Sequence, residues 1–237
     1  MGGLGAGPED PAARWQVTRG RAAFIVAHNR QELLNQTIAA IEPQVDVVIV
    51  LDNASDPPLE VGEGIHLLFV ERQPPNLAMW WNIGMNMADR YFRLDKNQPY
   101  DLAILCDDAI VPEGWFDAVT QAMREANAAA GSSSPWGHPF GTIYKDRPDN
   151  DIMHRMCSWA FIVDGTTRVR ADESMHWWWF DSDLDFRLRQ SGGTVLIGTH
   201  PVANAQPNHY TNVKPELGEQ AGRDRATFAA KWGGTPW

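Results

Sequence analysis

The amino-acid sequence predicts a single α/β domain with a mostly parallel central sheet and helices on its two faces. Short, continuous apolar runs alternate with segments of helical periodicity, which is the pattern of a doubly wound sheet. Turn-forming residues separate these segments. The length of 237 residues fits one such domain, because single α/β domains often run past roughly 200 residues without splitting.

The first strand–helix–strand unit is the clearest part of this pattern. Residues 22–27 (AAFIVA) form a continuous apolar run, which is typical of a strand buried on both faces. Apolar residues then recur at helical spacing across 30–41, and Pro43 ends that pattern. Residues 46–51 (DVVIVL) form the next apolar run. Strand, helix and strand in this order imply a parallel pair of strands.

The alternation continues to the middle of the chain. Residues 65–70 and 101–106 are predicted as strands, and residues 77–91 as the helix between them. Pro112 is suited to the first turn of a following helix, whose inner face carries Trp115 and other apolar residues.

The pattern changes after residue 130. Residues 131–150 are rich in Gly, Ser, Pro and Asp, which predicts a long loop. A strand over 159–163, a helix over 181–191 and a strand over 194–197 follow, and the rest of the chain is irregular apart from a short helix over 218–231.

Composition narrows the class of protein. The net charge of −10 disfavours nonspecific binding to nucleic acid or anionic lipid. The apolar runs are far shorter than the about 20 residues that span a bilayer, and residues 1–20 are predicted as a flexible tail without a secretion signal before a domain over 21–237. Two cysteines without zinc-site spacing favour a reducing, cytoplasmic location.

Carboxylates follow the predicted strands at three places, where open α/β sheets bind their ligands. Asp52 follows the second strand and would equally suit an Asx turn. Asp107 and Asp108 follow the fourth strand, and two adjacent acids there indicate a hard divalent cation with phosphate oxygens, although a polar turn explains them as well. Asp181 and Asp183 lie at the start of a later helix, where acids also serve as caps.

Spacing separates the acids of that later helix. Asp183 and Asp185 each have an arginine four residues on, at Arg187 and Arg189, so each can form an ion pair along the helix. Asp181 is therefore the acid left for chemistry. His209 lies beyond the last strand, and its position alone does not mark it as functional.

The order of these segments resembles the inverting family 2 glycosyltransferases over roughly residues 21–232. AFIVAHNRQELLNQTIAAI is similar to the opening strand, Asn-Arg turn and helix of that family. VVIVLDNASD and NLAMWWNIGMNMA resemble the next strand with its Asp-Asn-x-Ser turn and the helix with paired Asn and Gly. LAILCDDAIVPEGWF resembles the metal-binding DxD segment with Cys106 in place of its first Asp, and WWFDSDLDFRLRQSGG resembles the Glu-Asp-x-Asp-Leu helix with Phe180 in place of the Glu.

The resemblance implies the GT-A fold and a metal-dependent, inverting transfer of sugar from a nucleotide diphosphate sugar, a UDP- or dTDP-sugar, to an acceptor hydroxyl. It implies Mn²⁺ or Mg²⁺ bound by Asp108 and His209, and Asp181 as the catalytic base. The nucleotide-sugar contacts that it implies are Ala27, His28, Asn29, Arg30, Asp52, Asn82 and Asp107. Residues 21–112 then form the nucleotide-sugar half of the domain and residues 113–237 the acceptor and catalytic half, with Trp177, Trp178, Trp179 and Asp183 on the acceptor side.

Several alternatives stay open at this point. A nucleotidyltransferase would use a similar sheet and acidic site, but a Gly-rich phosphate loop normally follows its first strand, and His28 follows here. A catalytically inactive sugar-nucleotide-binding module of the same fold would fit the exchanges at Cys106 and Phe180. The acceptor is a glycan, a lipid-linked sugar, a protein or a hydroxymethylated DNA base. Net charge disfavours DNA, although five basic residues around the long loop would form a local positive rim: Lys145, Arg147, Arg155, Arg168 and Arg170.

Overall fold

The structure is a computed structural model that describes residues 18–70, 74–135, 142–145, 155–206 and 214–235. Within these ranges the chain forms one eight-stranded sheet, with the strand order β3-β2-β1-β4-β8-β6-β9-β7. The strands are β1 (Gly20–Ala27), β2 (Val47–Asp52), β3 (His66–Phe69), β4 (Tyr100–Cys106), β6 (Ala130–Ser133), β7 (Thr142–Lys145), β8 (Ala160–Asp164) and β9 (Thr194–Ile197). A small antiparallel pair joins β5 (Ala109–Ile110) and β10 (Ala203–Asn204).

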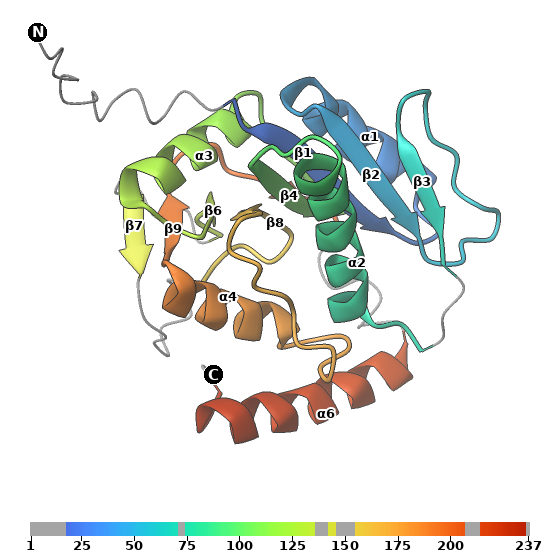
Figure 1. Cartoon of the computed structure of the whole chain (residues 1–237). Coiled ribbons are helices and arrows are strands. Elements are labelled where there is room, and N and C mark those ends of the chain that lie inside the picture. Colours follow the sequence, from blue (N-terminus) through green and yellow to red (C-terminus); the bar gives the residue numbers. More distant parts are fainter. Residues whose placement is uncertain (1–17, 71–73, 136–141, 146–154, 207–213, 236–237) are drawn as a thin grey trace, which may run out of the picture.

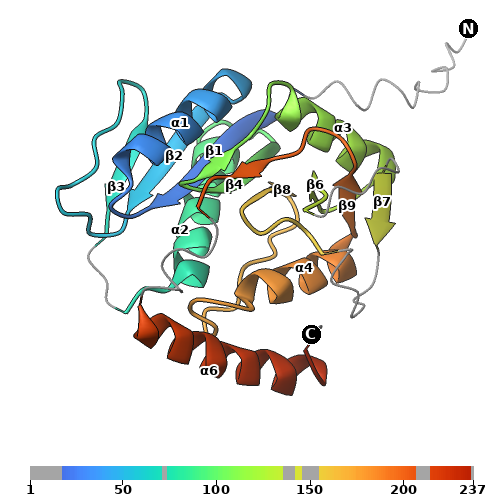
Figure 2. The ribbon, with the colours of Figure 1, turned by 180° about the vertical axis from the view of Figure 1, so that it is seen from behind.

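The helices form layers on the two faces of this sheet (Figures 1 and 2). They are α1 (Gln31–Ile41), α2 (Leu77–Asp89), α3 (Trp115–Ala126), α4 (Phe180–Ser191) and α6 (Pro215–Trp232). One hydrophobic core packs α2 and α4 against one face, and a second core packs α1 and α3 against the other. Helix α6 lies outside α4, and its Phe228 packs against Trp179 and Phe186.

The strand alternation of the first half of the chain is confirmed. β1 pairs in parallel with β2 and with β4, and β2 pairs in parallel with β3. Every residue of β2 is buried, as expected for a strand covered on both faces. The carboxyl ends of β1 and β4 therefore meet at one edge of the sheet, which is the edge where ligands bind in open α/β sheets.

The second half of the sheet differs from the sequence prediction. The segment predicted as a long loop over 131–150 contains β7, and the preceding β6 reaches Ser133. β6 has the sequence AGSS, which lacks the β-branched residues that mark strands. A Cβ on Gly131 would lie 2.9 Å from both Met123 Cγ and Val195 Cγ1, so only a small residue lets α3 and β9 pack this closely.

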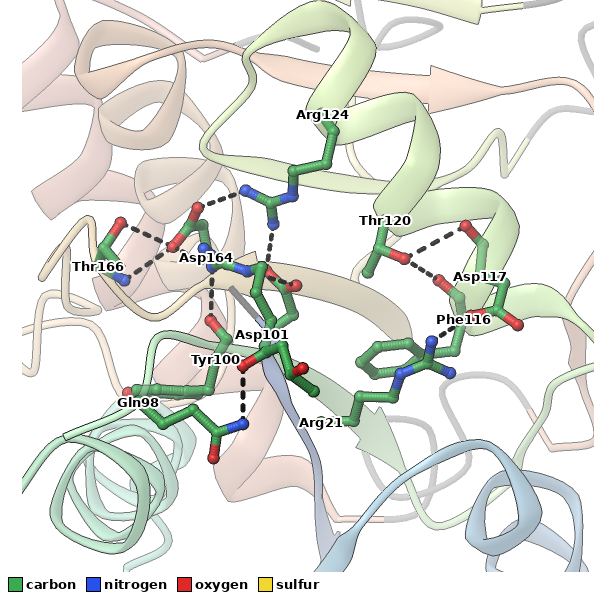
Figure 3. A network of polar contacts seen from close by, with 12 residues as sticks. Arg21, Gln98, Tyr100, Asp101, Phe116, Asp117, Thr120, Arg124, Asp164 and Thr166 are labelled. Carbon is green, nitrogen blue, oxygen red and sulfur yellow. Dashed lines mark hydrogen bonds and ion pairs between the residues drawn. The ribbon is translucent and has the colours of Figure 1, made fainter. Parts of the chain in front are cut away.

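Four charged side chains join the strands at the amino end of β4 (Figure 3). Asp101 and Asp164 lie opposite each other in the antiparallel β4–β8 pair. Arg124 from α3 donates hydrogen bonds to both carboxylates, at 2.7 Å to Asp164 Oδ2. Arg19 donates to Asp101 Oδ2 at 2.9 Å and to Asp164 Oδ1 at 2.7 Å. This Arg–Asp network ties the entry of β1 to β4, β8 and α3.

The start of the domain lies slightly earlier than predicted. β1 begins at Gly20, so the predicted tail over residues 1–20 overlaps the first strand. Cys106 and Cys157 are both free thiols. No helix among the described residues is long and apolar enough to cross a membrane.

Candidate active site

A cavity of about 510 Å³ opens where β1 and β4 end and α4 begins. Strand ends, the first turn of α4 and one side of α6 all contribute to its wall. Ten residues named in the sequence analysis line this cavity: Ala27, His28, Arg30, Cys106, Asp107, Asp108, Trp177, Trp178, Trp179 and Asp181. Residues separated by more than a hundred positions in the chain thus share one hollow.

The acidic pair after β4 is bridged by one arginine. Arg30 Nη1 lies 3.1 Å from Asp107 Oδ1 and 2.9 Å from Asp108 Oδ2. Both aspartates are buried. Burial raises the pKa of Asp107 to about 7, with the charge of Asp108 adding to the effect and that of Arg30 opposing it. Burial also raises the pKa of Asp108, against the lowering effect of Arg30. One guanidinium therefore does not fully offset the two carboxylates.

The turn after β1 is held by hydrogen bonds to the turn after β2. His28 Nδ1 lies 2.7 Å from the carbonyl oxygen of Asn53, and burial lowers the pKa of His28, which keeps the imidazole neutral at pH 7. Asn29 adopts a left-handed φ of 54°. Its amide N–H donates to Ser55 Oγ at 2.8 Å, and its Oδ1 accepts from the amide of Asp56 at 2.7 Å. Asn29 shapes this turn but is not among the residues that line the cavity.

Asp52 takes the role of an Asx turn. It is 1% exposed, and its two carboxylate oxygens accept the backbone N–H groups of Ser55 at 2.9 Å and Leu59 at 3.0 Å. It does not line the cavity, whereas the next residue, Asn53, does. Its oxygens are directed into its own loop, and Asn53 is the residue of this turn at the cavity. The contact of Asp52 with the nucleotide stays a prediction.

Asn82 is also directed away from the cavity. Its amide exchanges hydrogen bonds with the backbone of Ala171, at 2.8 and 3.0 Å, and donates to Glu173 Oε1 at 2.9 Å. This amide anchors the segment before the tryptophans to α2, and the nucleotide contact of Asn82 stays a prediction. The cavity wall from α2 consists of Leu77, Trp80 and Trp81 instead.

Asp181 lies in the first turn of α4 and lines the cavity. Its side chain is 17% exposed, and Arg155 Nη1 lies 3.8 Å from its Oδ2. The same guanidinium nitrogen lies 3.2 Å from Ser182 Oγ. A partly exposed carboxylate with a cation nearby can accept a proton from a bound hydroxyl and can be held in place while it does so.

The other two acids of α4 are fully buried and do not line the cavity. Asp185 pairs with Arg189, and Asp183 pairs with Arg187 at 3.6 Å, as their spacing predicts. Asp183 also accepts from Lys231 Nζ at 2.6 Å and from Trp232 Nε1 at 2.9 Å. Asp183 thus joins α4 to α6, and its place on the acceptor side stays a prediction.

The three tryptophans before α4 form one wall of the cavity. Trp177 and Trp178 are partly exposed, whereas Trp179 is buried. Trp179 has a left-handed φ of 69°, a conformation that costs on the order of 1–3 kcal/mol for a residue other than glycine and that is concentrated at functional sites. Flat aromatic side chains here suit contacts with a sugar ring or another flat group.

Several lining residues were not identified from the sequence as parts of one site. They come from the segment before β8, from β10 and from α6: Arg155, Ser158, Trp159, Asn204, Gln206, Lys214, Glu216, Leu217, Gln220 and Arg223. The sequence did contain a signal for α6, namely the helical spacing of Leu217, Asp224 and Phe228. The structure buries all three on one face of the helix. A carboxylate on the apolar face of a helix is unusual enough to indicate a specific partner.

The basic rim considered for DNA is divided between different contacts. Arg155 lines the cavity, while Arg170 donates to Asn86 Oδ1 at 3.0 Å and lies 3.8 Å from Asp89. Arg147 lies outside the described residues, as does His209. The predicted metal contact of His209 therefore has no structural description here.

The donors at the end of β4 fit a hard divalent cation. Asp107 and Asp108 supply carboxylate oxygens, which Mn²⁺ and Mg²⁺ prefer. Burial raises the pKa of both side chains, so a cation that bound there would stabilise their ionised forms. Burial raises the pKa of the Cys106 thiol well above its ordinary value, which disfavours the thiolate. Within the described ranges no three His, Cys, Asp or Glu side chains are grouped to hold a metal, so further ligands would have to come from a bound substrate or from His209.

No protein-family model and no curated protein matches the sequence. Solved structures do match. Residues 1–349 of TarS from S. aureus superpose with a TM-score of 0.56 at 9% identity, over 89% of this chain and 69% of that one. The chain spans 42% of the longer TarS structure.

A second match is glucosyl-3-phosphoglycerate synthase from Mycobacterium tuberculosis, in a structure with Mn²⁺, UDP-glucose and phosphoglyceric acid. Its TM-score is 0.62 at 13% identity, over 94% of this chain and 82% of that one. TarS has a structure in complex with UDP-GlcNAc. Both proteins are GT-A glycosyltransferases. The chain therefore has the GT-A fold, a mostly parallel sheet between helices in a single domain.

Proposed function

We propose that this protein is a metal-dependent, inverting glycosyltransferase that uses a UDP- or dTDP-sugar as donor and a hydroxyl group as acceptor. One observation carries the proposal: the acidic pair after β4 and the carboxylate of Asp181 line the same cavity of a GT-A fold. The TarS and glucosyl-3-phosphoglycerate synthase structures, with UDP-GlcNAc and with UDP-glucose, support a nucleotide-sugar donor.

The donor side of the proposed site consists of residues after β1, β2 and β4. The diphosphate binds beside Arg30 and the acidic pair, and the nucleoside binds near Ala27, His28 and Asn53, which line the same cavity. Asp108 would hold a Mn²⁺ or Mg²⁺ ion together with His209, and Asp107 would contact the ribose or support the metal ligand. When bound, the ion supplies positive charge that stabilises the leaving diphosphate.

The acceptor side of the proposed site consists of the tryptophans before α4 and of Asp181. The acceptor oxygen forms a bond to the anomeric carbon as the bond from that carbon to the diphosphate oxygen breaks. Asp181 takes the proton of the acceptor hydroxyl, and the nucleoside diphosphate leaves with the bonding electrons. Attack from the side opposite the leaving group inverts the anomeric centre. Arg155, 3.8 Å from Asp181, orients that carboxylate.

In this proposal, residues 21–112 bind mainly the donor and residues 113–237 bind mainly the acceptor and supply the base. The acceptor hydroxyl belongs to a glycan, a protein or a hydroxymethylated DNA base. Binding to duplex DNA that weakens steeply with salt would separate the last case from the others.

The test is a panel of UDP- and dTDP-sugars, each incubated with the protein in MnCl₂ and in EDTA. We expect one sugar nucleotide to raise the melting temperature in Mn²⁺ and to be hydrolysed slowly, with proton NMR showing the inverted anomer as the first product. A retained anomer would refute inversion. Binding without any turnover would indicate an inactive binding module. Pyrophosphate release from a nucleoside triphosphate would indicate a nucleotidyltransferase.

A further inference from the structure

Helix α6 carries a carboxylate at a position where an apolar residue would be expected. Asp224 is fully buried, on the same helical face as Leu217 and Phe228. Burial of an ionised carboxylate is unfavourable unless hydrogen bonds replace its hydration. An apolar residue would be enough to dock this face of α6, so the carboxylate indicates a specific interaction.

The partners of Asp224 are three consecutive backbone amides of the tryptophan segment. The N–H groups of His176, Trp177 and Trp178 donate to its carboxylate oxygens at 3.0, 2.7 and 2.9 Å. A fourth hydrogen bond, at 2.7 Å, comes from Gln220 Nε2 one turn earlier on α6. Successive backbone N–H groups that converge on one anion form an anion-binding concavity, and here a side chain of the same chain fills it.

This contact lies directly behind the acceptor wall of the cavity. Trp177 and Trp178 line the cavity, and Asp181 follows them at the start of α4. A second restraint on the segment is the hydrogen bond from the Leu77 amide to the His176 carbonyl, at 2.8 Å. The far end of α6 holds α4 itself, through Lys231 and Asp183.

We propose that Asp224 is a positioning residue for sugar transfer. By fixing the backbone of residues 176–178, it sets the aromatic acceptor wall and the direction in which the chain enters α4, and so the place of Asp181 relative to the donor. The effect of Asp224 on the backbone of residues 176–178 is independent of the proposed function. The effect of Asp224 on sugar transfer rests on that function.

The first test uses Asp224→Asn, which keeps the shape but replaces one accepting oxygen with a donor. With 5-fluorotryptophan incorporated, and Trp177 and Trp178 assigned through single Phe variants, we expect the fluorine resonances of these two residues to shift or broaden. The resonance of Trp115, which is buried at the start of α3, should stay in place. Asp172→Asn is the matched control, because Asp172 also holds α6, through Lys231 at 2.7 Å, and does not contact the amides of 176–178. Unchanged Trp177 and Trp178 resonances, or equal shifts in the control, would overturn the proposal.

A milder variant covers the case in which Asp224→Asn does not fold. Gln220→Met removes one of the four hydrogen bonds to Asp224. We expect smaller shifts of the same two resonances, and no shift at all would also overturn the proposal.

The second test measures catalysis with the sugar nucleotide that the wild type hydrolyses. We expect Asp224→Asn to bind UDP with Mn²⁺ within about twofold of the wild type and to lower turnover at saturating donor by a factor on the order of 10 to 100, since small misplacements of reacting groups have effects of this size. Normal turnover beside shifted resonances would refute the catalytic role of Asp224. A wild type that binds neither UDP nor dTDP would refute the proposed function instead and would leave the fluorine result valid.

Discussion

Buried aspartates with arginine partners lie at both ends of β4, but the two ends differ in the balance between carboxylates and arginines. At the amino end, Asp101 and Asp164 share two arginines, Arg19 and Arg124. At the carboxyl end, Asp107 and Asp108 share Arg30. The first network is balanced in charge, and the second has one more carboxylate than arginine.

The pKa values follow this difference. Burial opposes ionisation of Asp164, but the hydrogen bonds from Arg124 and Thr166 and the charge of Arg19 outweigh it and lower its pKa. Burial raises the pKa of Asp101, so at the amino end one acid is raised and one is lowered. At the carboxyl end the pKa values of both acids are raised.

Cavity size does not distinguish the two ends. The hollow beside Asp101 has a volume of about 550 Å³, close to the about 510 Å³ of the candidate active site. Charge balance and the aromatic wall distinguish them. An acidic cluster in an α/β protein is therefore better judged by its unpaired charge than by the hollow next to it.

The largest effect should come from Asp181, the proposed base, which lines the cavity at the carboxyl end of β4. Asp181→Asn keeps the shape and the N-terminal place in α4 but removes the proton acceptor, so transfer should fall by a factor on the order of 100 to 10,000. Steady-state kinetics, with donor affinity measured by calorimetry, should show this loss at nearly unchanged donor binding. A near-normal rate would mean that Asp181 only caps the helix, because Asn caps equally well.

A smaller and different effect is expected at the amino end. Arg124→Met keeps the aliphatic stem of the side chain but leaves Asp101 and Asp164 with fewer donors, which should lower the free energy of unfolding by about 1–3 kcal/mol. Urea denaturation measures this change. UDP binding should remain normal. A loss of UDP binding in a folded Arg124→Met protein would contradict the division of roles between the two ends.

The smallest effect is expected at the surface ion pair between Asp172 and Lys231. Asp172→Asn should cost about 0.2–1 kcal/mol at pH 7, as exposed pairs usually do. Burial opposes ionisation of Asp172, but hydrogen bonds from Lys231 and Ser174 outweigh it and lower its pKa from 3.8 to about 2.

The pH dependence of this pair follows from that lowered pKa. Its contribution is complete above the unfolded value of 3.8 and is lost as the pH falls toward about 2. Denaturation curves of wild type and variant should therefore converge as the pH is lowered through this range. A difference that stays constant down to the lower pKa would contradict the ion pair.

The sequence predicts the first half of the fold because parallel strands that are buried on both faces consist of consecutive apolar residues. The segments that became β1, β2 and β4 are of this kind. β6 was not predicted, because its sequence AGSS is typical of a loop. Its Gly131 is explained only by the close packing of Met123 and Val195 in the folded chain. The antiparallel pairing of β8 with β4 joins segments that lie far apart in the chain, and local sequence patterns do not determine such a pairing.

The sequence could predict those residues of the candidate site that directly follow a strand or begin a helix, because these positions lie at the edge of the sheet. Asp107, Asp108 and Asp181 all line the cavity. Asp52 and Asn82 are close in sequence to residues that line the cavity, but their own side chains form hydrogen bonds with backbone groups. A motif therefore predicts which segment reaches a site more reliably than which way one side chain points. The contact of Asp224 exists only because α6 folds back on the tryptophan segment.

We propose that the carboxyl end of β4 binds a metal–diphosphate and that the amino end does not. Calorimetric titration with UDP, in Mn²⁺ and in EDTA, tests it for the wild type, Asp108→Asn and Arg124→Met. We predict that Mn²⁺ tightens UDP binding by the wild type and by Arg124→Met, and that Asp108→Asn loses this increase. Equal UDP affinity of the wild type in Mn²⁺ and in EDTA, or an increase that survives in Asp108→Asn, would contradict the account.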